Sequence, residues 1–352
     1  MKRTAIFLSL SFLFSMQLTA QTDFSKQADE SMKVAVGGTF GKSKIIPRLD
    51  KLAIAQASIY FKTASTSEVI ENERGVFGQR KSGGGSVAGR ITAYLEITDG
   101  EMTQEDYQVL ADGFYAYLGK QLAASGVTAV GWESIAATDF YKNEGKELDD
   151  IRKDESEMKK KGQIYTVVNS NQGNSLYRYN ISGGISPSFA FGKIKKASRF
   201  SEDLGASVVF MHLTVDFADI WLDGDVKTAN SRQETMFYTK VTSSKKFKMD
   251  AEVGADVKVT TNGLSMFWNE KSQTENLNVI KDISSNMPFS AGVSQDANRE
   301  VLRKKDNLFA KDFNMTPMVV TTTKAQYKAA AQKALENYAD TFVAKVKMSK
   351  KD

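Results

Sequence analysis

The segment Lys245–Thr260 limits the possible folds most, because apolar and polar side chains alternate along its whole length. A period of two predicts a β-strand with one apolar and one charged face. The apolar face would carry Phe247, Met249, Ala251, Val253, Ala255, Val257 and Val259, and the other face Lys248, Asp250, Glu252, Gly254, Asp256, Lys258 and Thr260.

Two interpretations fit this strand. It can lie half-buried on an antiparallel sheet, or it can be one arm of a hairpin that inserts into a membrane, for which roughly 9–11 residues suffice. The partner arm would then be Glu234–Ser243, joined by a polar turn at residues 243–246, but Thr239 and Lys240 interrupt its two faces. An inserting arm needs a continuous apolar band. We therefore expect a sheet strand that is shielded by protein.

Two strands are predicted early in the chain. The dense apolar run Leu52–Phe61 and the alternating segment Arg90–Thr98 both have strand length. Residues 64–88 lie between them and contain glycine and charge clusters, so we expect a flexible loop there.

The clearest helix signal follows the second strand. Thr103 and Asp106 resemble a capping box, and apolar residues then recur at helical spacing until Ser125. The short segment Val127–Trp132 predicts another strand, and the charged residues 138–161 predict a solvated helix.

The second half is richer in strand signals and ends in an amphipathic helix. The predicted fold class is therefore α/β (α+β), with a β-rich elaboration and a closing helix. Further strands are expected at Gln163–Val168, Ala206–Trp221, Glu234–Val241 and Leu264–Trp268. The predicted organisation is a signal peptide over 1–20, a loosely ordered lead-in over 21–50, an α/β core over 51–222, the β-rich part over 223–323 and the helix over 324–346.

The amino-terminal residues predict export. Lys2 and Arg3 precede an apolar run that is shorter than the roughly 20 residues of a membrane span, which indicates a signal peptide cleaved after Ala20. A retained anchor is the alternative. The chain has no cysteine, so neither lipid attachment at the cleavage site nor a disulfide framework is available. We expect a periplasmic or secreted protein of a Gram-negative-type cell.

The charge balance gives no support for nucleic acid as a partner. Without Lys2 and Arg3 the formal net charge falls from +5 to +3 over the 332 residues that follow Ala20, which is close to neutral for this size. After the leader, the longest apolar run is only of strand length, so no stable membrane span is expected.

Residues 52–141 resemble a known family pattern of strand, interrupting loop, strand, helix and strand. The helix segment LADGFYAYLGKQLAASG at Leu110–Gly126 is followed by WESIAATDFYK at Trp132–Lys142. This block resembles the α/β domain shared by the curli secretion channel subunit, the activators of penicillin-binding proteins and the amino-terminal domain of the Tol translocation protein B. The resemblance covers about a quarter of the chain and implies a fold. Unlike the channel subunit and the activators, which are lipoproteins, this chain has no cysteine to lipidate.

Two motifs suggest enzyme chemistry but lack its context. Residues 36–43 approach a phosphate-binding loop, yet Val36 stands where the first glycine is required and Pro47 falls in the helix that should follow. His212 is the only histidine and lies inside a predicted strand, so any histidine-dependent catalysis or zinc binding would depend on it alone. A packed strand histidine is the simpler interpretation.

Two further patterns also lack the residues that their chemistry requires. The cluster Asp216, Asp219, Asp223 and Asp225 offers oxygen ligands, but it lacks the residue order of a calcium loop, so a solvated strand end is favoured. Ser156 and Lys159 have the spacing of a serine–lysine pair within the charged segment, without the companion motifs.

No catalytic, cofactor-binding or metal-binding residue is therefore predicted, and no cofactor. The chain is predicted to be a non-enzymatic envelope protein that binds or assembles another envelope protein, with a homo-oligomer possible. The alternatives are an oligomeric secretion or pore-forming element that uses the strand pair 234–260, and a carboxylate-dependent hydrolase.

Overall fold

The structure, a computed structural model, describes residues 23–36, 45–72, 86–144, 162–173, 176, 179–180, 184–185, 192–234, 239–261, 263–303 and 310–351. The fold is mixed α/β with a closing carboxy-terminal helix, as predicted. The helices are α1 (Phe24–Ser31), η1 (Ile46–Arg48), α2 (Gln104–Ala124), α3 (Trp132–Ala136), α4 (Asp139–Glu144), η2 (Ser170–Gln172), α7 (Gly192–Leu204) and α8 (Lys324–Lys351). The strands are β1 (Met32–Val36), β2 (Lys51–Asn72), β3 (Ser86–Ile97), β4 (Thr128–Ala129), β5 (Gln163–Asn169), β6 (Tyr179–Asn180), β7 (Gly184–Ile185), β8 (Ser207–Glu234), β9 (Thr239–Val259), β10 (Leu264–Trp268), β11 (Thr274–Val279), β12 (Ile283–Ser284), β13 (Gly292–Gln295), β14 (Ala310–Asn314) and β15 (Met318–Thr322).

Most described strands join one 13-stranded sheet, and β6 and β7 form a separate pair. The main path through the sheet is β1-β11-β10-β8-β2-β3-β15-β13. β2, β3 and β4 all belong to it, which confirms the sheet expected from the segments 52–61, 90–98 and 127–132. Of the last segment, only Thr128 and Ala129 are paired.

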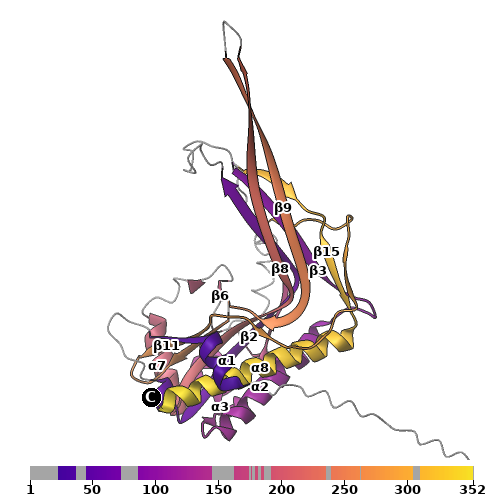
Figure 1. The fold of residues 1–352 in the computed structure, drawn as a ribbon. Coiled ribbons are helices and arrows are strands. Elements are labelled where there is room, and N and C mark those ends of the chain that lie inside the picture. Colours follow the sequence, from indigo (N-terminus) through magenta and orange to yellow (C-terminus); the bar gives the residue numbers. More distant parts are fainter. Residues whose placement is uncertain are drawn as a thin grey trace, which may run out of the picture.

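Helices cover both faces of the lower part of the sheet (Figure 1). α2 and α8 lie together on one face, where Phe114 and Tyr338 face each other with ring centroids 6.0 Å apart. α2 begins as the sequence predicts, because Thr103 and Asp106 form a full capping box. α3, α4 and α7 cover the other face, and Phe140 stacks on Phe200 there.

β2 is long enough to serve two parts of the sheet. Its first half pairs in parallel with β8, from Leu52–Ser207 to Phe61–Val215. Its second half pairs with β3, from Ala64–Tyr94 onward. β5 pairs with β2 across both halves, so β8 and β3 must occupy the same edge of β2 one after the other. The sheet therefore forks near Lys62, where β8 leaves and β3 takes its place.

Beyond the fork, β8 and β9 continue together as a long ribbon, which we call the arm (Asp216–Glu234 with Thr239–Val259). The two strands pair antiparallel from Val215–Val259 to Glu234–Thr239. The arm runs beside β2 and β3 and then projects past every other labelled element (Figure 1). The predicted turn at residues 243–246 is wrong, since these residues lie inside β9 and the partner strand is β8. The polar residues 243–246 have the composition of a turn, but their pairing with β8 keeps them in the strand.

Other segments also differ from the prediction. The expected lead-in over 21–50 contains α1 and β1, and Met32 and Ile46 are buried in the main core. The strands β2 and β3 extend into the expected loop at 64–88, of which residues 73–85 lie outside the described part. β8 runs without a break past residue 222, where the core was expected to end.

Candidate functional site: the arm and its base

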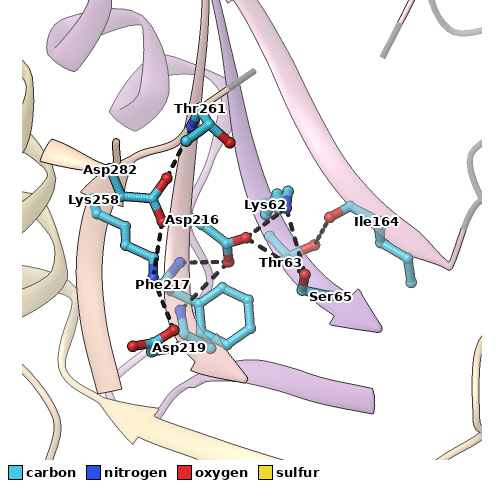
Figure 2. Close-up of polar contacts among 11 residues, drawn as sticks. Lys62, Thr63, Ser65, Ile164, Asp216, Phe217, Asp219, Lys258, Thr261 and Asp282 are labelled. Atoms are coloured by element: carbon cyan, nitrogen blue, oxygen red, sulfur yellow. Dashed lines mark hydrogen bonds and ion pairs between the residues drawn. The ribbon is translucent and has the colours of Figure 1, made fainter. Parts of the chain in front are cut away.

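A buried ion pair marks the point where the arm leaves the sheet (Figure 2). Lys62 Nζ of β2 lies 2.5 Å from Asp216 Oδ2 of β8, and both side chains are buried. The other oxygen, Asp216 Oδ1, accepts the backbone N–H groups of Phe217 at 2.9 Å and Ala218 at 3.4 Å. The β8–β9 register shifts between Asp216 and Ala218. The carboxylate therefore stabilises the irregular backbone that redirects β8 into the arm.

A second charged group braces the same region from β9. Lys258 Nζ lies 3.1 Å from Asp219 Oδ1 and 3.2 Å from Asp282 Oδ2. Burial alone would lower the pKa of Lys258, but the two carboxylates outweigh it and hold that pKa above its usual value. Asp282 also accepts the backbone N–H of Thr261 at 2.9 Å. Lys258 thus ties both strands of the arm to the loop that carries Asp282.

Arg90 plays a similar part on the β2–β3 side of the fork. Its guanidinium forms ion pairs with Glu68 of β2 and with Asp312 Oδ1 of β14, the latter at 2.7 Å. Arg90 is almost fully buried. A buried charge of this kind requires its partners, so the contacts fix β2, β3 and β14 as one rigid layer beside the arm.

The part of the arm nearest the fork has two unlike faces. Along β9, Lys248, Asp250 and Glu252 are exposed, whereas Phe247, Met249, Ala251 and Val253 are half-buried and Val257 and Val259 are buried. This agrees with the predicted sidedness over residues 247–254. Nearer the base the prediction is wrong, since Asp256 is half-buried and Lys258 and Thr260 are buried although they belong to the predicted charged face. On the charged face, Trp221 of β8 is paired with Glu252 and remains 56% exposed.

Both edges of the arm lack a backbone partner in the part of the chain that the structure describes. β8 pairs only with β9 from Asp216 to Glu234, and β9 pairs only with β8 from Thr239 to Asp256. At the base, β12 closes the outer edge of β9 at Lys258 and Val259. The arm is therefore a ribbon with open edges that can accept another strand.

His212 lies in the middle of the sheet, where β8 pairs with β2 and β10. Its side chain is 2% exposed, and its ring lies 6.5 Å from that of Tyr60. Burial lowers the pKa of His212 to about 3, so the imidazole is neutral at neutral pH. A residue that acts on a substrate must reach it, and this position offers no access to one.

The structure separates the acidic residues that the sequence groups. Asp216 is buried against Lys62, whereas Asp219, Asp223 and Asp225 lie further along β8. No group of three or more His, Cys, Asp or Glu side chains suited to a metal ion occurs among the described residues. Residues 1–22 and 37–44, Ser156 and Lys159 lie outside the described ranges.

A hollow of about 510 Å³ lies at the opposite end of β8 from the arm. It opens at the start of β2 and β8, between the end of α7 and the β10–β11 turn. Its rim carries Arg48, Lys51 and Lys271 together with Asp50 and Glu270. Because the rim carries charges of both signs, its electrostatics favour no particular class of ligand.

Sequence patterns did not indicate the residues at the base of the arm. Lys62 directly follows an apolar run, and Arg90 opens a predicted strand. A charge at the end of an apolar strand is the one available signal, because such a residue is buried only when a partner neutralises it. The identity of that partner depends on which strand is the neighbour, and Asp216 is 154 positions away.

None of the described helices combines the length and apolar character that crossing a membrane requires. The resemblance of residues 52–141 to the envelope domain family stays a prediction. Comparisons of this chain with family models, with curated proteins and with solved structures found no match.

Proposed function

We propose that the protein is a non-enzymatic binding or assembly component of a bacterial envelope, exported through a cleaved leader, and that the arm engages its partner protein. The observation that carries this proposal is the projecting ribbon, whose two edges have no backbone partner along its described length.

Open strand edges favour addition of a further strand. An isolated two-stranded ribbon is marginally stable in water, so a third strand that completes the backbone hydrogen bonds stabilises it. The exposed charges at Lys248, Asp250 and Glu252 are typical of edges that must not pair indiscriminately. A partner with a complementary strand is the ligand that such a ribbon fits.

Photo-cross-linking from the arm tests the proposal. A photo-reactive amino acid in place of Glu252, in cells that naturally make the protein, should give an adduct of defined mass. The matched control is the same amino acid in place of Glu270, which is exposed at the far end of the sheet. Equal adducts from both positions, or none from either, would contradict the proposal.

A pair of proline variants then tests strand addition itself. Consecutive residues of a strand point their N–H groups to opposite edges, so Asp250→Pro and Ala251→Pro each remove a donor from a different edge of β9 and leave position 252 free for the photo-reactive amino acid. The variant that loses a hydrogen bond to β8 should have a lower melting temperature. The variant that loses a donor on the outer edge should abolish the adduct while its melting temperature changes little. Persistence of the adduct in both variants would exclude edge pairing. Release of dye from vesicles by the wild-type protein alone would favour the pore-forming alternative instead.

A further inference from the structure

The arm is docked against β2 and β3 by one phenylalanine that lies between two glycines of different layers. A Cβ atom on Gly89 of β3 would lie 2.9 Å from Phe247 Cζ and 2.3 Å from Met249 Sδ. A Cβ atom on Gly224 of β8 would lie 3.0 Å from Phe247 Cζ and 2.9 Å from Val69 Cγ1. A side chain at Gly89 would therefore displace Met249 and Phe247, and one at Gly224 would collide with Val69, so the docked arm depends on both glycines as long as these neighbours are unchanged.

Phe313 of β14 adds a further contact between the two layers. The rings of Phe247 and Phe313 meet edge to face, with centroids 5.2 Å apart. We call this set (Val69, Gly89, Gly224, Phe247, Met249 and Phe313) the clasp. Backbone ladders hold each layer together internally. Among the described strands β3 pairs with neither β8 nor β9, so the layers meet through side chains at the clasp. Such packing is the sum of individually small attractions and can be broken without unpairing any strand.

The base of the arm supplies a pivot. The β2–β5 register shifts between Lys62 and Ala64, and the β8–β9 register shifts between Asp216 and Ala218. Irregular positions of this kind bend strands, and here both flank the fork. The Lys62–Asp216 pair and the Lys258 contacts anchor the base. The arm is therefore fixed at one end and held by the clasp further along.

We infer that the clasp is a releasable, autoinhibitory contact. In the docked position the apolar stripe Phe247, Met249, Ala251 and Val253 is half-buried, and release of the clasp exposes this stripe further to the partner of the arm. The statement that the exposed stripe meets a partner rests on the function proposed above. Release turns the arm about the fork and leaves the basal sheet unchanged.

An engineered disulfide tests whether release is required. A Cβ atom on Gly224 would lie 2.9 Å from Val69 Cγ1, so the variant Val69→Cys, Gly224→Cys puts a bonded sulfur in place of that methyl group. Phe247 Cζ, 3.0 Å from the new Cβ, then needs to shift by only a few tenths of an ångström. The chain has no other cysteine, so oxidation within one molecule can only lock the arm. The locked protein should lose the adduct from position 252 about tenfold or more, and reduction should restore it. Failure of the thiols to pair, or equal adducts before and after reduction, would overturn the inference.

A matched set of glycine variants tests the release directly. A thiol introduced by Ala251→Cys, on the half-buried stripe, reports exposure through its rate of maleimide labelling. In this background Gly89→Val, which forces the clasp apart, should accelerate labelling about tenfold. Gly254→Val, on the outer face of the same arm, should leave the rate unchanged, since its nearest neighbour atom lies 3.9 Å away. Equal rates in the two variants would overturn the clasp.

The two experiments separate the inference from the function on which it rests. Labelling that responds to Gly89→Val in a protein that gives no adduct would refute the proposed function and support the clasp. An adduct that forms equally in the locked and reduced proteins would refute the clasp and support the proposed function.

Discussion

Lys62 and Asp216 are both buried, and their ion pair stabilises the fork where β8 leaves β2. The carboxylate is satisfied on both oxygens, by the ammonium of Lys62 on one and by two backbone N–H groups on the other. Removing one charge of a buried pair is costly because the other stays behind without a counter-charge. The pair therefore has more effect on stability than any exposed charge pair in the arm.

Lys62→Met should lower the free energy of unfolding by about 3–5 kcal/mol, because Asp216 is left buried and uncompensated. Lys248→Met is the matched control, since Lys248 pairs with Asp250 at 2.8 Å on the exposed face of the arm. That change should leave the free energy of unfolding nearly unchanged, because water and salt screen an exposed pair. Urea denaturation of both variants measures the difference, and equal losses would mean that water reaches Asp216.

His212 makes stability depend on pH in a direction that follows from its burial. Its pKa in the folded protein is about 3, whereas an unfolded histidine has a pKa near 6.5. Between these values the unfolded chain binds a proton that the folded protein does not, so stability falls as the pH falls below about 6.5.

Wild-type protein should lose about 1.4 kcal/mol more than His212→Leu between pH 7.5 and pH 5.5. Denaturation curves at the two pH values give this difference. Because the chain has a single histidine, its imidazole resonance can also be followed by NMR without overlap. A resonance that titrates near pH 6.5 in the folded protein would contradict the buried, neutral assignment.

Among the elements, α2 illustrates what periodicity predicts well. Its start, its end and its buried stripe all agree with the sequence, because capping residues and apolar spacing are local signals. α8 was predicted from Lys324 for the same reason and extends to Lys351.

Phe114→Asp should destabilise the protein by about 4 kcal/mol or prevent folding, because it places a charge among the apolar residues between α2 and the sheet. Val109→Asp is the control on the same helix, since Val109 is 62% exposed and should tolerate the change within about 0.5 kcal/mol. Thermal unfolding followed by circular dichroism compares the two. Similar melting temperatures would mean that the helix faces are assigned wrongly.

Strand pairing, in contrast, was only partly predictable from the sequence. The alternation at Lys245–Thr260 predicts a strand and its two faces, but the predicted partner Glu234–Ser243 is wrong, since Glu234 ends β8 and residues 239–243 belong to β9 itself. Periodicity reports which face of a strand is apolar and not which strand lies beside it. The clasp could not be predicted from the sequence either, since it depends on Gly89, Gly224 and Phe247 meeting in space.

At the scale of the whole molecule, the proposed export predicts a specific mature chain. Protein recovered from the cell envelope should begin at Gln21, because cleavage is predicted after Ala20. Intact mass, with allowance for a cyclised amino-terminal glutamine, measures this directly. Recovery of a chain that still begins at Met1 would contradict the prediction and favour a retained anchor.

The double use of β2 also sets the order in which the chain can fold. Leu52 pairs with Ser207, which is made 155 residues later, and the same strand edge continues into β3. Contacts between positions so far apart close slowly, because a long loop must first lose its freedom. Until β8 is synthesised, the apolar first half of β2 has no neighbour on that edge, and exposed strand edges promote aggregation. We therefore expect the nascent chain to depend on a holding chaperone during the interval between the synthesis of β2 and that of β8.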